Sequence, residues 1–117
     1  MEKISKNVEE LLMRFQIQNQ QLENLIVQKQ NLIAKKTELD NAYKELNNTS
    51  DQEVYKIAGP IIIKSDKEKL KTGLEQEREE TELKLKMLEK NEKKLRESIE
   101  KSREELQQIL PTLEKEE

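Results

Sequence analysis

The chain has 117 residues, of which 40% are charged and only 32% are apolar, so it lacks the side chains needed to fill a compact globular core. Acidic and basic residues alternate and nearly balance, with a net charge of −3, and the abundance of Glu, Lys, Leu and Gln indicates a coiled coil. The chain contains no His and no Cys, which removes the commonest bases, nucleophiles and metal ligands of enzymes and excludes a disulfide framework.

A first helix is predicted over residues 4–48 by a heptad pattern of apolar residues. Alternating steps of four and three residues give a register that neither Pro nor Gly interrupts. We expect the helix to end at residues 47–51, because the short polar side chains of NNTSD compete for the backbone and favour turns. The predicted seam consists of Ile4, Val8, Leu11, Phe15, Gln18, Leu22, Leu25, Lys29, Leu32, Lys36, Leu39, Tyr43 and Leu46.

Some apolar residues of this helix lie off the seam. Leu12, Met13 and Ile17 are near its start, and Met13 and Ile17 share one face because they are four residues apart. A flexible Met with scattered Leu and Ile tolerates varied shapes, so these residues and Leu110 are candidates for binding unfolded polypeptides. The alternatives are that Leu12 widens the seam and that Leu110 covers a fraying end. Ile26, Val27 and Ile33 also lie off the seam, nearer the middle of the helix. We interpret them as a broadened core stripe or as a contact between coiled coils.

A two-stranded β-hairpin is predicted for residues 53–64, EVYKIAGPIIIK. Gly59-Pro60 fits a two-residue turn, in which Gly supplies a positive φ and Pro a φ near −65°. The hairpin would then pair Ile57 with Ile62 and Lys56 with Ile63. Apolar side chains would cover both faces, with Tyr55, Ile57 and Ile62 on one face and Val54, Ala58, Ile61 and Ile63 on the other.

Such a hairpin is marginal by itself in water and has two unpaired edges. The helix ends could cover one of its faces, but they could not cover both faces and both edges. Completing a β-barrel or sheet with neighbouring subunits would remove the edges. The residues predicted to mediate this oligomerisation are Val54, Tyr55, Ile57, Ile61, Ile62 and Ile63.

A second helix is predicted over residues 66–110. Ser65 and Glu68 fit a capping box at its start, and Pro111 should end it, leaving residues 111–117 as a tail. Gly73 indicates either close backbone packing or a neutral surface position. The predicted seam consists of Leu74, Arg78, Thr81, Leu85, Leu88, Glu92, Leu95, Ile99, Ser102, Leu106, Ile109 and Leu113.

The two seams match if the helices fold back antiparallel. Phe15 would then lie opposite the small Ser102, and Lys29 and Glu92 would fall in adjacent layers where they could pair. The predicted fold is therefore mainly α. It is a single domain over residues 1–117, a long antiparallel coiled-coil hairpin joined by the β-hairpin, with both termini at one tip.

The sequence VYKIAGPIII at residues 54–63, set between two long heptad helices, resembles the β class of prefoldin subunits. The segment VQKQ at residues 27–30 is also similar to that class, whereas α-class subunits have a longer insert of four strands. The resemblance implies a hexamer of two α-class and four β-class subunits on a β-barrel platform. It also implies an ATP-independent chaperone that binds unfolded proteins at the coiled-coil tips and transfers them to a group II chaperonin.

Other functions find little support in the sequence. With two glycines and no phosphate-binding loop, we expect no nucleotide, cofactor or metal and no enzyme activity. Interleaved Lys and Glu argue against nucleic-acid binding, and no apolar stretch approaches the roughly 20 residues of a membrane span. We therefore expect a soluble, cytoplasmic protein. The alternative function is a structural coiled-coil tether that dimerises through its helices.

Overall fold

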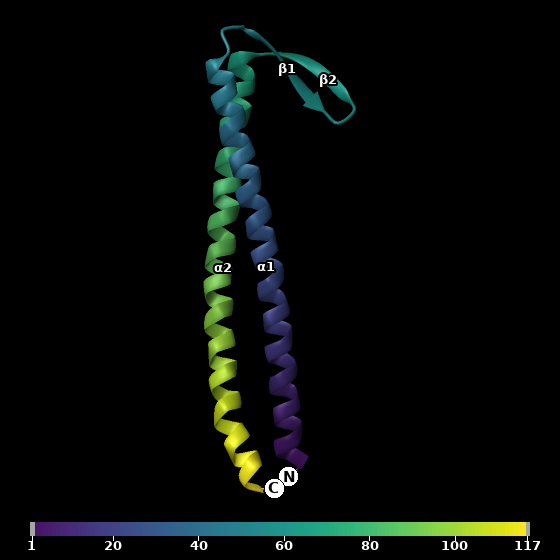
Figure 1. The fold of residues 1–117 in the computed structure, drawn as a ribbon, viewed down its shortest axis with the longest axis vertical. Coiled ribbons are helices and arrows are strands. Elements are labelled where there is room, and N and C mark those ends of the chain that lie inside the picture. The colour runs from purple at the N-terminus through teal and green to yellow at the C-terminus, as the bar shows by residue number, and fades with distance from the viewer. Residues whose placement is uncertain (1, 117) are drawn as a thin grey trace. The chain divides into compact units, whose positions relative to one another are not determined.

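The structure, a computed structural model, describes the backbone of residues 2–116 and the side chains of residues 6–109. The elements follow in the order α1 (Glu2–Asn48), β1 (Glu53–Ala58), β2 (Ile61–Asp66) and α2 (Lys67–Glu116) (Figure 1). The mainly α fold with a two-stranded insert is thereby confirmed. The chain forms two units, which we call the terminal unit (Met1–Lys29 with Leu88–Glu117) and the central unit (Gln30–Met87).

In the terminal unit, the buried side chains are those of the predicted seam. Val8, Leu11 and Leu106 are almost inaccessible, and Phe15, Leu22, Leu25 and Leu95 are half-buried. Lys29 Nζ lies 3.7 Å from Glu92 Oε2, which confirms the predicted pairing of the two charged seam positions.

Ser102 makes a polar contact across the two helices that the seam prediction did not include. The buried Ser102 hydroxyl donates a 2.9 Å hydrogen bond to Oε1 of Gln18, the seam residue that follows Phe15. A buried hydroxyl needs an acceptor, and the seam amide supplies it.

In the central unit, Leu39, Leu46 and Leu85 form the buried seam. Thr81 is only 2% exposed, and its hydroxyl is satisfied because it donates to the Glu77 carbonyl oxygen 2.7 Å away.

The charged seam positions of the central unit are compensated across the two helices. Lys36 Nζ lies 3.6 Å from Glu82 Oε1, and Arg78 Nε lies 3.1 Å from Asp40 Oδ1. Tyr43 donates its hydroxyl to Glu75 Oε1 at 3.0 Å. These contacts pair the polar groups at seam layers that contain a charged or hydroxyl-bearing side chain.

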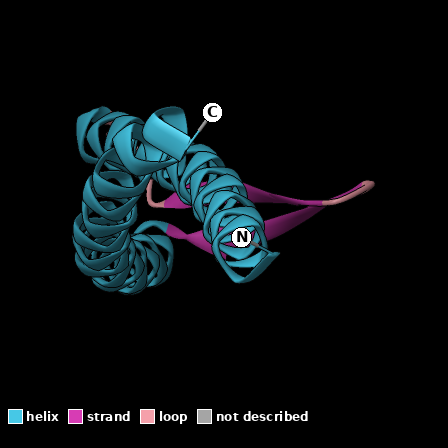
Figure 2. Ribbon diagram, turned by 90° about the horizontal axis from the view of Figure 1, so that it is seen from below, coloured by secondary structure: helices cyan, strands magenta, loops and turns pink. Residues whose placement is uncertain are grey.

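The two strands of the hairpin run side by side and are joined by a short turn (Figure 2). Their register is the predicted one, with Ile57 opposite Ile62 and Lys56 opposite Ile63. Gly59 has a φ of 60°, as the two-residue turn requires. Strand β2 is longer than predicted, however, because Ser65 pairs with Val54 and Asp66 with Glu53.

The predicted capping box at Ser65 is therefore wrong. Asp66 caps α2 instead, since its Oδ1 accepts a 2.7 Å hydrogen bond from the Lys69 backbone N–H, the third helical residue. Strand β2 continues through Asp66 and α2 begins at Lys67, so Asp66 and not Ser65 is the residue directly before the helix, where a side-chain oxygen reaches the free N–H groups of the first turn.

The predicted end of the second helix near Leu110 is also wrong, because α2 continues through Pro111 to Glu116. Proline removes one backbone hydrogen bond and crowds the preceding turn, but its fixed φ near −65° is itself helical. The helix formers on either side of Pro111 continue the α conformation, so residues 111–116 do not form a separate non-helical tail.

Candidate functional site

The hairpin exposes apolar side chains on both of its faces. The exposed fractions are 65% for Tyr55, 76% for Ile57 and 69% for Ile62 on one face, and 57% for Ile61 and 46% for Ile63 on the other. Val54 and Ala58 are half-buried. Exposed apolar side chains in such density mark an interaction surface. The helix ends therefore cover neither face of the hairpin completely.

The outer edges of the hairpin are unpaired within the described chain. The sheet contains only β1 and β2, so each strand has one neighbour. At its base the hairpin is fastened to α2, because Lys67 donates from its backbone N–H to the Gln52 carbonyl oxygen at 3.0 Å and from Nζ to the Thr49 carbonyl oxygen at 2.9 Å. The result is a tethered strand pair whose backbone groups at both edges can accept a further strand.

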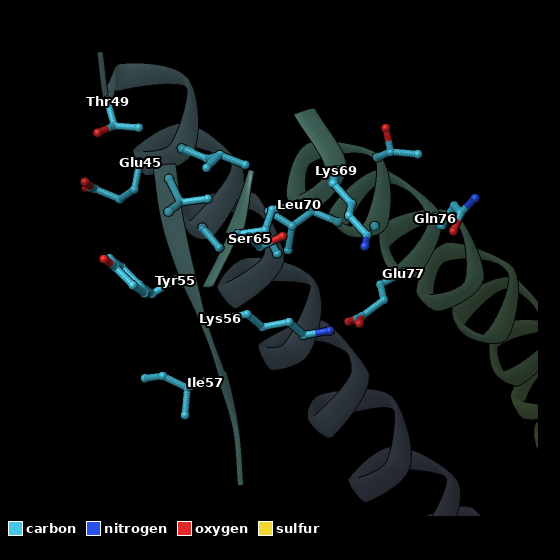
Figure 3. Close-up of a pocket in the computed structure, with 16 residues that line it drawn as sticks. Glu45, Thr49, Tyr55, Lys56, Ile57, Ser65, Lys69, Leu70, Gln76 and Glu77 are labelled. Atoms are coloured by element: carbon cyan, nitrogen blue, oxygen red, sulfur yellow. The ribbon is translucent and has the colours of Figure 1, made fainter. Parts of the chain in front are cut away.

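An open hollow of about 980 Å³ lies between the hairpin and the adjoining turns of α1 and α2 (Figure 3). Apolar parts of its wall come from Leu46, Val54, Leu70 and Leu74. Lys56 on β1 and Glu77 on α2 point toward each other across it (Figure 3). The hollow has the size and apolar lining of a site that receives side chains, and it adjoins the exposed hairpin.

The predicted client-binding residues of α1 lie on the surface of the terminal unit. Leu12 is 42% exposed, Met13 63% and Ile17 52%, so none of them is taken up by the seam. Leu110, the fourth candidate, lies outside the residues whose side chains the structure describes.

Two exposed apolar residues, Leu83 and Met87 on α2 of the central unit, were missed by the sequence reasoning. They are 63% and 66% exposed, four residues apart, and on the helix face away from the seam. Their heptad positions could have revealed them, since a surface helix normally has polar residues there. Of the mid-helix residues, Ile26 is half-buried, whereas Val27 and Ile33 are exposed and therefore do not broaden the core.

No cluster of metal-ligating side chains occurs among the described residues. Within the same part of the chain, neither helix has the long apolar stretch that crossing a bilayer would require.

Comparison with known proteins identifies the family. The family model described as "Prefoldin subunit" matches residues 9–112. The chain belongs to the prefoldin subunit family. The prefoldin subunit beta of Pyrococcus furiosus is 33% identical over 93 residues, covering 79% of this chain and 80% of that protein. The prefoldin subunit beta of Thermococcus kodakarensis is 32% identical over 93 residues, with the same coverage of both chains.

A solved structure of the family shows the same fold. The crystal structure of the prefoldin beta subunit from Thermococcus strain KS-1 superimposes with a TM-score of 0.80 at 32% identity, covering 89% of this chain and 92% of that one. The predicted resemblance to the β class of prefoldin is thereby confirmed, and with it the role of a chaperone subunit rather than an enzyme. Membership of the prefoldin family implies hetero-oligomeric assembly with other prefoldin subunits.

Proposed function

We propose that this chain is a β-class subunit of a hexamer with two α-class and four β-class subunits, held together by a β-barrel of hairpins. The assembly binds unfolded proteins through the terminal units of its coiled coils. It transfers them to a group II chaperonin in the cytoplasm, without ATP. The observation that carries the proposal is the hairpin, whose faces are exposed and whose edges are unpaired within the described chain.

Burial of the hairpin supplies the driving force for assembly. Full burial of an Ile side chain contributes about 1.5–3 kcal/mol, so covering the exposed Tyr55, Ile57, Ile61, Ile62 and Ile63 stabilises the complex by several such increments per subunit. Pairing of the strand edges with neighbouring hairpins satisfies the backbone groups, as closure of a barrel does. The hollow beside Lys56 and Leu70 provides room for side chains of the adjacent subunit.

Client binding uses a different part of the chain. Leu12, Met13 and Ile17 in the terminal unit are exposed, apolar and of varied shape. Each such contact is weak, and useful affinity arises when several subunits engage one unfolded chain. Leu110, near the other end of the chain, completes the proposed client-binding set.

The test of assembly is the triple variant Ile57→Asp, Ile61→Asp, Ile62→Asp, mixed with an α-class subunit and measured by sedimentation velocity. We expect loss of the hexamer, because three charges would have to be buried in the barrel. The matched control, Leu83→Asp with Met87→Asp, places equally exposed charges on α2 and should leave the hexamer intact. A hexamer that survives the triple variant would refute the barrel and favour the alternative of a coiled-coil tether.

A further inference from the structure

The outward face of α1 in the terminal unit carries a stripe of uncharged residues. Met13, Ile17, Gln20, Asn24 and Val27 follow one another at steps of four, three, four and three residues, so they lie on one face of the helix. All five are exposed, and Met13, Ile17 and Val27 are 63%, 52% and 54% accessible. We call these five residues the α1 outer stripe.

The corresponding stripe of α2 in the same unit is entirely charged. The residues at the equivalent heptad positions of α2 are all exposed. They are Lys90, Lys94, Glu97, Lys101 and Glu104. The solvent-facing positions of a coiled coil normally have charged residues, as this stripe of α2 does. The uncharged stripe of α1 is therefore the exception that needs an explanation.

The amide side chains of α1 differ according to the face on which they lie. The half-buried Gln18 accepts from Ser102, and Asn19 Nδ2 donates to the Phe15 carbonyl oxygen at 2.8 Å. Gln20 and Asn24 on the outer stripe make no hydrogen bond to other described residues. Their amides are thus available to a ligand.

We propose that the α1 outer stripe binds a segment of non-native polypeptide, with Gln20 and Asn24 hydrogen-bonding to its unpaired backbone. This inference rests on the proposed chaperone function and extends the client site from Met13 and Ile17 to Val27. An amide side chain both donates and accepts, so it can pair with either backbone group of a client. An uncharged stripe also repels neither acidic nor basic clients.

The dimensions and composition of the stripe suit an unfolded segment better than a docked helix. From Met13 to Val27 the helix rises by about 21 Å, which is the length of roughly six residues of extended chain. A docking helix would require apolar contacts at nearly every stripe position, whereas here the apolar side chains stand at its ends and the amides at its centre. An extended client offers apolar side chains for the two ends of the stripe and backbone groups for the amides at its centre.

The test uses the complete assembly and a permanently unfolded probe, reduced and carboxymethylated lysozyme. In Gln20→Glu with Asn24→Asp, both amide donors are lost while size and shape are nearly kept, and we expect about tenfold weaker binding. The control, Lys94→Gln with Lys101→Gln on α2, changes the net charge by the same amount, and we expect less than about a twofold change. Helicity by circular dichroism and particle size by sedimentation establish that both variants fold and assemble.

A second measurement does not depend on altered binding. A photo-crosslinking residue placed at position 20 or 24 should capture the probe about five times or more as often as one placed at 94 or 101. Equal capture on both helices, or equal weakening by both variant pairs, would overturn the inference and leave the chaperone function intact. If the unaltered assembly fails to bind the probe, the proposed function itself is wrong.

Discussion

The seam and the hairpin of the central unit contain the same kinds of residue in opposite environments. Leu39 and Leu46 on the seam are each 8% exposed, whereas Ile57 and Ile62 on the hairpin are 76% and 69% exposed. The helices bury their apolar side chains against each other within one chain. Among the described residues, the exposed side chains of the hairpin have no such partner, and in the proposed assembly other subunits cover them. If the proposal is correct, folding and assembly of one subunit depend on separate sets of apolar residues.

The largest expected effect compares truncations in these two regions. Leu39→Ala removes a buried seam side chain, and we expect it to lower the free energy of unfolding of the isolated chain by about 2–3 kcal/mol. Ile57→Ala removes exposed surface, and we expect a change within about 0.5 kcal/mol. Urea unfolding followed by circular dichroism measures both values.

The assembled complex should reverse this order. There Ile57→Ala should raise the subunit concentration needed for assembly about tenfold, because the hairpin side chain is buried only in the complex. Sedimentation with the α-class subunit measures the effect. Equal loss of stability from Ile57→Ala and Leu39→Ala in the isolated chain would contradict the separation of folding and assembly residues.

The two glycines provide a second comparison of the same regions. Gly59 in the hairpin turn has a φ of 60°, so Gly59→Ala should destabilise the hairpin by about 1–2 kcal/mol. Gly73 lies in α2, and a Cβ added there would meet no atom within 4 Å. Gly73→Ala should therefore raise the free energy of unfolding by about 0.5–1 kcal/mol.

Thermal unfolding of the isolated chain measures the effect of Gly73→Ala, and sedimentation of the complex measures that of Gly59→Ala. A destabilising Gly73→Ala would show that the backbone at this position is closely packed. The open space around Gly73 argues against such close packing and favours the other interpretation, a neutral surface position.

The smallest expected effect concerns the junction between hairpin and helix. Asp66→Ala removes the acceptor for the Lys69 N–H and should cost about 1 kcal/mol of helix stability. Ser65→Ala, the matched neighbour, keeps the backbone ladder with Val54 and should change the unfolding free energy by less than about 0.5 kcal/mol. Urea unfolding compares the two variants, and the reverse order would place the helix cap at Ser65.

The sequence alone determined the features that follow from short-range geometry. Heptad spacing identified the buried positions of both helices, from Leu11 to Leu106, because helix periodicity decides which side chains share a face. Gly59-Pro60 set the turn and hence the pairing of Ile57 with Ile62, since a one-residue slip would move every side chain to the other face.

Only the tertiary structure decided features that depend on competition between neighbours. Strand β2 runs through Asp66, so the cap of α2 lies at Asp66 and not at Ser65, and the Ser102 hydroxyl hydrogen-bonds to Gln18 on the other helix. Periodicity shows that a residue is off the seam, but it does not show whether a neighbouring helix covers that residue. The structure shows that Val27 and Met87 are exposed. The coverage of a side chain and its partner on the other helix depend on many small contacts between residues distant in sequence, and no local pattern contains them.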